Sequence, residues 1–309
     1  MLLYTTSMSA IQVQKVQSLT GHRSAIYNLQ PTQDEGVILS AAGDGMIVRW
    51  NLSHPDEGEL VAKLPNSVYA IHLPESGLLL AGHNYDGIHL LDWRNKKEVA
   101  SLQLTRSAIF DIQSLHGLAY VGTGDGAVVV VDYRKMSVVR TLPSGSGSAR
   151  SIAVNDKRRE LAVGYSDHFI RIFDLDTYAL KKEWKAHQNS VFSVIYNQSH
   201  DLLLSGSRDA RLKAWDPQQD YVLRQEVVAH LFAINHITYS PDNKHFVTCS
   251  LDKTVKVWDA DRLSLLKVID KARHAGHSSS VNRVLWSSFQ NRLISAGDDR
   301  MISVWDVIF

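Results

Sequence analysis

The feature that most limits how this chain of 309 residues can fold is a short ending that recurs along its length. Strand-like runs end in a bulky apolar or aromatic residue followed by Asp or Asn at Trp50-Asn51, Leu91-Asp92, Val131-Asp132, Phe173-Asp174, Trp215-Asp216, Trp258-Asp259 and Trp305-Asp306. Successive endings are 41, 40, 42, 42, 43 and 47 residues apart. Because stacked repeats share one continuous core, this regularity predicts a single domain over residues 1–309, although the length alone suggests two.

The segment 186–228 shows how one repeat is built. Three short apolar runs, at 191–196, 202–206 and 212–215, are separated by polar turns, and a fourth run covers 221–228. Short runs bounded by turn residues predict antiparallel strands, and no helical periodicity competes with them. Four strands in a repeat of about 40 to 45 residues are typical of a propeller blade. The chain is therefore predicted to be all-β, a seven-bladed propeller of four-stranded antiparallel blades.

The last repeat has only three strands before the chain ends. We expect its missing outer strand to come from residues 11–19, where Ile11, Val13 and Val16 supply apolar positions. This pairing would close the ring and remove an exposed sheet edge. Deletion of residues 1–20 is therefore expected to destabilise the fold.

Four repeats also carry a His before the first strand, a Ser or Thr in the second, an Asp in the tight turn and the terminal Trp. The four sets are His22, Ser40, Asp44, Trp50; His187, Ser205, Asp209, Trp215; His230, Thr248, Asp252, Trp258; and His277, Ser295, Asp299, Trp305. Over about residues 11–309 the chain resembles the WD-repeat β-propeller family, in which these side chains form a buried hydrogen-bonded tetrad. The resemblance implies a structural role for them. Repetition in matching positions also argues against a hydrolase triad, so we expect no catalytic residues and no enzyme.

Repeats two, three and four depart from this pattern. Their terminal residues are Leu91, Val131 and Phe173, and the Ser or Thr position holds Ala81, Val121 and Val163. Loss of the indole donor and of the hydroxyl leaves fewer polar groups to satisfy. We therefore expect an apolar core in these blades.

A fold does not define a function, so a binding site has to be argued from surface positions. Alignment of the first strands places equivalent residues near the rim of the central channel, and the family places the residue before the tight-turn Asp on the same face. The predicted partner-binding rim is Tyr27, Tyr69, Phe110, Arg150, Phe192, Arg208, Asn235 and Asn282. Aromatic residues and Arg often anchor protein interfaces. We therefore predict a non-enzymatic scaffold or peptide-binding platform, with rings packed between blades and away from solvent as the alternative.

A second candidate surface lies at the ends of two neighbouring repeats, where an apolar residue, Asp, an aromatic residue and Arg follow one another. The pairs Asp92/Arg94 and Asp132/Arg134 resemble the Asp-x-Arg boxes by which some WD-repeat substrate receptors dock onto the adaptor of cullin-RING ubiquitin ligases. The resemblance implies an alternative function as a substrate-recognition subunit of such a ligase. Here Leu or Val stands first, where Trp or Tyr is common. Local pairing of Asp with Arg within each blade end is the competing interpretation.

Charge and composition set broader expectations. Lys plus Arg is 33 and Asp plus Glu is 32, which argues against a nucleic-acid partner. Cys249 has no second cysteine to pair with, and residues 1–10 do not resemble a signal peptide. The apolar runs are too short for membrane helices. We therefore expect a cytoplasmic protein, or a nuclear one in a eukaryote, that acts as a monomer or as a subunit of a larger complex.

The sequence predicts neither a cofactor nor a metal site. The chain has 14 histidines, but no zincin helix, paired cysteine motif or calcium loop accompanies them. We expect the pairs His83/His89 and His274/His277 to meet only through an accident of loop geometry. The linker-like run 143–148 is interpreted as a loop between the third and fourth blades.

Overall fold

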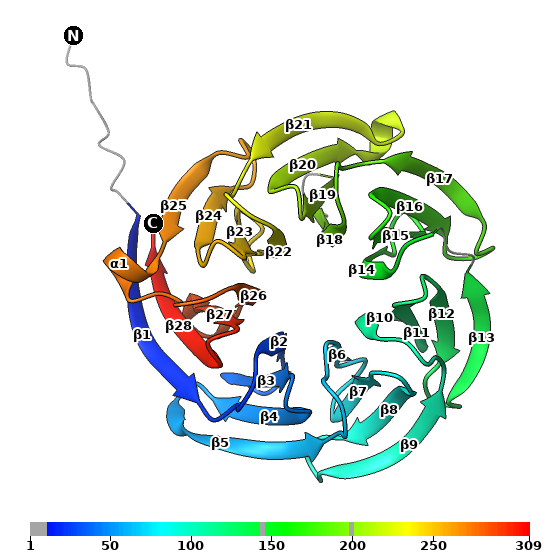
Figure 1. Ribbon diagram of the computed structural model, residues 1–309, viewed down its shortest axis with the longest axis horizontal. Coiled ribbons are helices and arrows are strands. Elements are labelled where there is room, and N and C mark those ends of the chain that lie inside the picture. The colour runs from blue at the N-terminus through cyan, green and yellow to red at the C-terminus, as the bar shows by residue number, and fades with distance from the viewer. Residues whose placement is uncertain (1–10, 143–145, 198–200) are drawn as a thin grey trace.

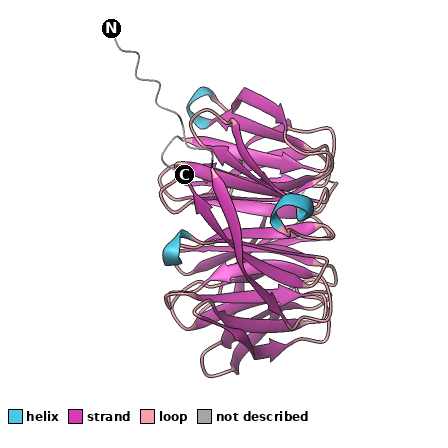
Figure 2. Ribbon diagram, turned by 90° about the vertical axis from the view of Figure 1, so that its left-hand side faces the viewer, coloured by secondary structure: helices cyan, strands magenta, loops and turns pink. Residues whose placement is uncertain are grey.

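The computed structural model describes residues 11–142, 146–197 and 201–309. Within these residues, seven four-stranded antiparallel sheets stand in a ring, so the predicted seven-bladed propeller is confirmed (Figure 1). The loops and turns lie along the two faces of the ring (Figure 2). Residues 1–10, most of the turn predicted at 197–201, and the start of the run 143–148 lie outside the described residues.

The blades are numbered in chain order, from the inner strand to the outer strand. Blade 1 consists of β2 (Ile26–Pro31), β3 (Val37–Ala42), β4 (Met46–Asn51) and β5 (His54–Lys63); blade 2 of β6 (Ile71–His72), β7 (Leu78–His83), β8 (Gly87–Asp92) and β9 (Lys97–Gln103). Blade 3 consists of β10 (Ile109–Leu115), β11 (Leu118–Thr123), β12 (Val128–Asp132) and β13 (Ser137–Leu142); blade 4 of β14 (Ala149–Asn155), β15 (Glu160–Tyr165), β16 (Phe169–Asp174) and β17 (Leu180–Lys185). Blade 5 consists of β18 (Val191–Asn197), β19 (Leu202–Ser207), β20 (Arg211–Asp216) and β21 (Val222–Val228); blade 6 of β22 (Ile234–Tyr239), β23 (His245–Ser250), β24 (Val255–Asp259) and β25 (Leu265–Ile269). Blade 7 consists of β26 (Val281–Trp286), β27 (Leu293–Gly297), β28 (Met301–Ile308) and the N-terminal strand β1 (Gln12–Thr20).

Helical structure in the described part of the chain is confined to short turns. These are α1 (Lys271–His274) and the 3₁₀ turns η1 (Pro217–Gln219) and η2 (Phe289–Asn291). Among the described residues, none of these helices has the length and apolar character needed to cross a bilayer.

The ring closes through the pairing of β1 with β28, as the sequence predicted. The register runs antiparallel from Gln12 opposite Ile308 to Thr20 opposite Met301, with an irregularity between Lys15 and Gln17. Leu19 is only 1% exposed and belongs to the hydrophobic cluster between blades 7 and 1. The N-terminal strand therefore both completes a sheet and fills a core.

Polar contacts join each blade to the next around the inner strands. At every one of the seven joints, a side chain of one blade hydrogen-bonds the backbone of the following blade. The side chains are Asn28, Asn84, Asp111, Ser151, Ser193, Asn235 and Asn282, and the last of them donates to Ile26 O of blade 1. Buried backbone groups that would otherwise lack partners are satisfied in this way.

All four predicted tetrads are hydrogen-bonded. In blade 5, Trp215 Nε1 donates to Ser205 Oγ at 2.9 Å, Ser205 Oγ contacts His187 Nε2 at 2.8 Å, and His187 Nδ1 lies 3.0 Å from Asp209 Oδ2. The same contacts are present in blades 1, 6 and 7. Because the hydroxyl accepts from the indole, it can donate to Nε2, which leaves Nδ1–H to donate to the carboxylate.

Blades 2, 3 and 4 have the apolar interior expected from their sequences. Leu91, Val131 and Phe173 take the place of the terminal Trp and are at most 5% exposed. The Ala81, Val121 and Val163 side chains in the Ser or Thr position are fully buried. Four contiguous blades, 5, 6, 7 and 1, are thus held by polar tetrads, and the other three by apolar packing.

The tetrads should make the fold sensitive to acid. Burial, opposed by the Asp partner, lowers the pKa of His22, His187 and His230 below its usual value. As the pH falls through about 6.5, the unfolded chain takes up protons on these imidazoles and the native chain does not. Stability is then lost at up to about 1.4 kcal/mol per pH unit for each histidine. We expect the melting temperature to fall steadily from about pH 7 to about pH 5, and a flat profile there would contradict this mechanism.

Candidate functional site

The predicted rim residues owe their position to a backbone irregularity. In six of the seven blades the register between the inner strand and its neighbour shifts by one residue, as between Ile26 and Asn28. The residues in the six shifts are Tyr27, Phe110, Arg150, Phe192, Asn235 and Asn282. A β-bulge of this kind re-aims a side chain. Tyr69 lies just before the two-residue strand β6 of blade 2.

These residues surround one pocket at the mouth of the channel. Its volume is about 520 Å³, and seven of the eight predicted rim residues line it: Tyr27, Tyr69, Phe110, Arg150, Phe192, Asn235 and Asn282. All seven are partly exposed. The interpretation in which the rings pack away from solvent is therefore wrong for these side chains, which contact one another and still reach the pocket.

The aromatic residues and Arg150 form a continuous row across blades 1 to 5. The Tyr27 and Tyr69 rings meet edge to face with centroids 4.7 Å apart, and Tyr69 stacks on Phe110 at 5.8 Å. The Arg150 guanidinium carbon lies 3.9 Å from the centroid of Phe110 and 4.8 Å from that of Phe192. Rings that hold one another in place lose little conformational freedom when a ligand binds.

Arg150 brings a positive charge into this row. No ion pair is found for it among the described residues, and its charge is held against two aromatic faces. Burial, together with the nearby Arg208, lowers its pKa, although Tyr69 acts in the opposite direction. Arg208 itself is exposed and does not line the pocket, so this predicted rim residue stands outside the site.

Asn235 and Asn282 line the pocket but are also used to join blades. Asn235 Nδ2 donates to Ser280 Oγ at 3.0 Å and to Val281 O at 2.8 Å. Asn282 Nδ2 donates to Ile26 O at 3.1 Å and to Asp298 Oδ1 at 2.7 Å. Their amide donors are therefore already engaged, which favours the aromatic side of the pocket as the binding surface.

Three further residues that line the pocket, Tyr85, Ala108 and Arg283, were missed in the sequence. Tyr85, in the turn between β7 and β8, lines the pocket and is 61% exposed. Tyr85 stands four residues after Ala81, the spacing at which the other repeats have the tight-turn Asp, but the direction of its side chain depends on the turn. Arg283 follows Asn282 on β26 and also lines the pocket. The side chain of Arg283 belongs to the channel wall, which an alignment of rim positions does not include.

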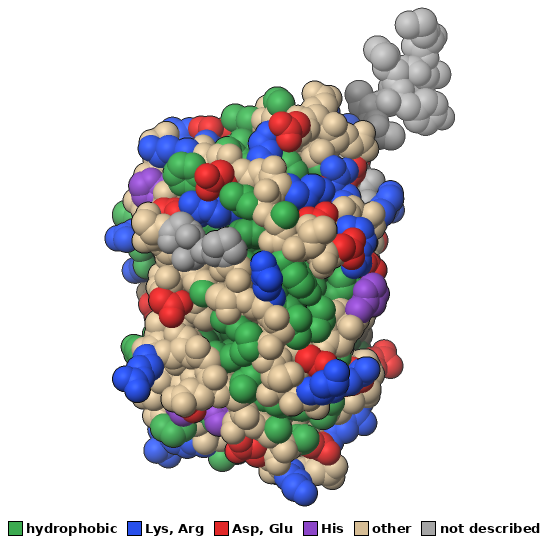
Figure 3. All heavy atoms as spheres, turned by 90° about the vertical axis from the view of Figure 1, so that its right-hand side faces the viewer, with side chains coloured by type: hydrophobic (Ala, Val, Ile, Leu, Met, Phe, Trp, Pro, Cys, Tyr) green, Lys and Arg blue, Asp and Glu red, His purple; other side chains and the backbone are tan. Residues whose placement is uncertain are grey.

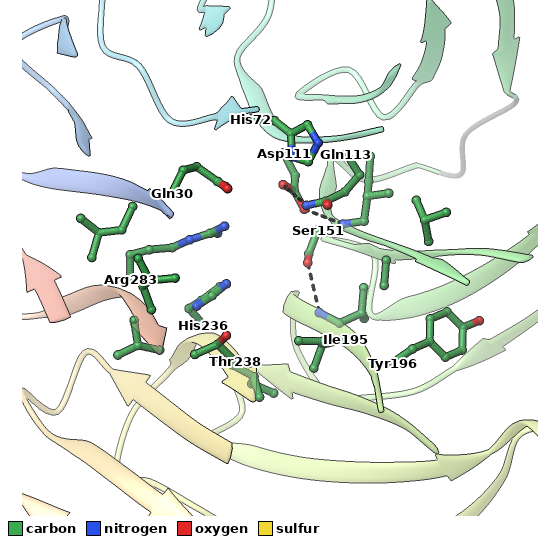
Figure 4. Close-up of a pocket in the computed structure, with 18 of the residues that line it drawn as sticks. Gln30, His72, Asp111, Gln113, Ser151, Ile195, Tyr196, His236, Thr238 and Arg283 are labelled. Carbon is green, nitrogen blue, oxygen red and sulfur yellow. Dashed lines mark hydrogen bonds between the residues drawn. The ribbon is translucent and has the colours of Figure 1, made fainter. Parts of the chain in front are cut away.

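A second cavity of about 430 Å³, shown in Figure 4, lies next to the rim pocket and shares Arg283 with it. Arg283 lines both spaces and extends from β26 toward the middle, across from Asp111. Asp111 accepts from Ile152 N at 2.8 Å, and no direct ion pair between Asp111 and Arg283 is found among the described residues. Arg283 Nε is buried without a hydrogen-bond partner in that part of the chain.

Two histidines in this cavity are held neutral. Burial and then the charge of Arg283 lower the pKa of His72 to about 4. The same two causes, in the same order, set the pKa of His236 well below its usual value. Among the described residues that line this cavity, Arg283 is the one Lys or Arg side chain, and it also stands at the floor of the rim pocket.

The Asp-x-Arg boxes have a different arrangement from the one expected. Arg94 donates to Asp34 of blade 1, and Arg134 donates to both carboxylate oxygens of Glu75 of blade 2. The aspartates of the boxes instead bond to their own turns, Asp92 to Asn95 and Asp132 to the backbone N–H groups of Arg134 and Lys135. The Arg pairing therefore links neighbouring blades and is not local to each blade end.

Charged groups on the outer side of the ring are mixed in sign. Figure 3 views the side that carries β13 and β17, where Lys and Arg side chains alternate with Asp and Glu around a patch of hydrophobic side chains. The outer strand β13 itself carries two exposed valines, Val138 at 50% and Val139 at 49%. This face has no dominant positive surface.

A family model described as "WD domain, G-beta repeat" matches residues 13–51, 179–216, 222–259 and 270–306. These segments contain the four complete tetrads. The chain belongs to the WD-repeat β-propeller family. WD-repeat propellers generally serve as non-enzymatic scaffolds for protein interaction. Blades 2 and 3 and the three inner strands of blade 4 fall outside the matched segments, because their apolar interiors replace the residues that define the repeat.

Several curated WD-repeat relatives are similar to most of the ring. The chain is 25% identical over 215 residues to the WD repeat-containing protein 91 homolog of Dictyostelium discoideum, covering 66% of this chain and 28% of that protein. It is 26% identical over 195 residues to the Intraflagellar transport protein 80 homolog of Mus musculus, covering 58% of this chain and 24% of that protein. It is 21% identical over 194 residues to THO complex subunit 3 of Arabidopsis thaliana, covering 62% of this chain and 61% of that protein. The match thus spans less than two thirds of each relative.

Proposed function

We propose that this WD-repeat propeller binds an extended peptide segment of a protein partner at the mouth of its channel. The observation that carries the proposal is the continuous row Tyr27, Tyr69, Phe110, Arg150 and Phe192, partly exposed around one pocket. Fully desolvated aromatic and Arg side chains at the centre of an interface contribute most of its binding energy. One of the relatives is named as a subunit of the THO complex, which agrees with a partner of this class.

The charges of the pocket indicate the chemistry of the peptide. Arg150 lies in the wall and Arg283 at the floor, and neither has an ion pair among the described residues. A guanidinium offers paired donors that match a carboxylate. A peptide with an apolar or aromatic side chain next to Asp or Glu would place its ring on the aromatic row and its carboxylate toward the arginines.

The proposal extends to the setting of the protein. A net formal charge of +1 and the mixed charges of the outer side favour a protein partner over a nucleic acid or a membrane surface. We place the protein in the cytoplasm, as a monomer or as a subunit of a larger complex. No observation favours docking through the Asp-x-Arg boxes, whose arginines are engaged with neighbouring blades, and that hypothesis stays a prediction.

Substitution of Tyr69 and Arg150 together should remove partner binding. Truncation of two central anchors typically costs at least about 2 kcal/mol each, so we expect affinity to fall by more than about 100-fold for Tyr69→Ala with Arg150→Ala. The measurement is capture of partners from a lysate followed by mass spectrometry, together with panning of a displayed peptide library enriched in acidic residues.

The matched control is Arg140→Ala with Tyr178→Ala, which removes the same residue types from positions that do not line the rim pocket. Thermal melts of all variants separate lost binding from lost folding. If the rim variant captures the same partners and enriches the same peptides as the wild type, the channel mouth is excluded as the binding site.

A further inference from the structure

Three potential metal ligands converge in the hairpin between β7 and β8 of blade 2. His83 Nδ1 lies 3.1 Å from His89 Nε2 and 3.4 Å from Asp86 Oδ2, and His89 Nε2 lies 4.0 Å from the same carboxylate oxygen. The three ligand atoms all lie within 4.8 Å of one another. His83 and His89 are therefore brought together by the pairing of β7 with β8 and by the turn between them, neither of which points to a metal site in the sequence.

The turn of blade 2 differs from the others in a way that produces this arrangement. In the other six blades the fourth turn residue has the positive φ, as at Gly45 with φ 78° and Gly126 with φ 95°. In blade 2 the third residue, Tyr85, has φ 70°, and Asp86 follows it. This blade also has Ala81 and Leu91 in place of the tetrad hydroxyl and indole. Asp86 is thus free of a tetrad and is turned toward the two imidazoles.

The distances fit a tetrahedral ion. Zinc bonds of about 2.0–2.1 Å to His nitrogen and carboxylate oxygen imply separations of about 3.3 Å between ligands in a tetrahedron. Two of the three observed separations lie within about 0.2 Å of this value, and the third needs a small rotation of the Asp86 side chain. The imidazole and carboxylate donors also suit zinc-class ions better than calcium or magnesium.

A neighbouring carboxylate orients one of the three ligands, His89, as is common in metal sites. His89 Nδ1 lies 3.0 Å from Glu98 Oε1 on β9. A proton on Nδ1, donated to Glu98, leaves the lone pair of Nε2 directed at the cluster, and carboxylate partners of this kind fix the tautomer of zinc-bound His. His83 Nε2 contacts the Asn66 side-chain amide at 3.4 Å, and the opposite amide orientation would provide the matching acceptor.

The two histidines of the cluster are mostly buried, and its Asp86 side is open to solvent. The side chains of His83 and His89 are 11% and 13% exposed, and that of Asp86 is 43% exposed. We propose that His83, Asp86 and His89 form a binding site for Zn²⁺ or a similar divalent transition metal, with solvent in the fourth position. This proposal is independent of the rim. Bound metal would fix the turn that carries Tyr85, which lines the rim pocket.

The test is titration of tag-free, chelator-treated protein with ZnCl₂ in a non-chelating buffer near pH 7.5, followed by calorimetry and by thermal melts. We expect one equivalent of Zn²⁺ to bind with a rise in melting temperature. Asp86→Asn and His89→Ala should each weaken binding by at least about 100-fold. Glu98→Gln should weaken binding by about 10- to 100-fold, because it acts through His89.

His116→Ala is the matched control, since this exposed histidine of blade 3 pairs with Asp156 of blade 4 and lies outside the cluster. It should bind zinc like the wild type. Asp86→Asn keeps the size of the side chain, and an unchanged melting temperature without metal would show that its loss of binding is not a loss of folding. Equal zinc uptake by the wild type and His89→Ala, or no saturable uptake by the wild type, would overturn the site and leave a hydrogen-bonded His–His–Asp cluster.

Discussion

Deletion of residues 1–20 is expected to abolish the cooperative folding of the propeller. The deletion removes all of β1, exposes the β28 edge along a pairing that runs from Gln12–Ile308 to Thr20–Met301, and takes Leu19 out of the core between blades 7 and 1. We expect a loss on the order of 5 kcal/mol or more, which is comparable to the whole stability of many domains. Circular dichroism melts and size-exclusion chromatography would measure the loss and the aggregation that an open sheet edge favours.

A shorter deletion, of residues 1–10, leaves β1 in place and is the matched control. A synthetic peptide of residues 11–20 added to the long deletion should restore stability in a concentration-dependent way, because an open edge accepts an added strand. A long-deletion variant that melts cooperatively within a few degrees of the wild type would show that ring closure contributes little.

Ser205→Ala in the tetrad of blade 5 should produce the second-largest effect. The Ser205 hydroxyl accepts from Trp215 Nε1 and contacts His187 Nε2, and all three side chains are buried. Its removal leaves two buried polar groups without a partner, at about 1–3 kcal/mol each. We therefore expect a loss of about 2–5 kcal/mol in the free energy of unfolding, measured by urea denaturation.

Ser137→Ala is the control for this substitution, because Ser137 is exposed on the outer strand β13. Its effect should stay within about 0.5 kcal/mol. A loss below about 1 kcal/mol for Ser205→Ala would show that water or a rearranged imidazole can replace the hydroxyl at little cost.

The ring itself was predictable because its determinants repeat. Each blade carries its own terminal residue and turn, so a repeat with an irregular sequence can still be located from the spacing of the others. The closing strand follows from the missing strand of the last repeat. The fold of blades 2 to 4 was harder to predict, since Leu91, Val131 and Phe173 replace the indole, but their spacing was kept.

The site was predictable only where it follows the repeat. Six rim positions coincide with the one-residue register shift of the inner strand, so alignment of the first strands found them. Arg208 lies outside the pocket because a turn residue has no such fixed direction. The positions of Tyr85 and of the His83–His89 contact depend on the one turn that departs from the pattern. The position of Arg283 depends on a side chain that extends across the channel. Neither feature has a counterpart in the other repeats.

The closure of the ring also determines how it would respond to tension. β1 and β28 are antiparallel neighbours, and the first residue of β1 pairs with the last residue of β28 (Figure 1). A force that pulls the two ends of the chain apart would therefore separate the hydrogen bonds of this pair one after another, since it never loads them all at once. Mechanical opening would start at this seam and would require much less force than a sheet loaded along its strands.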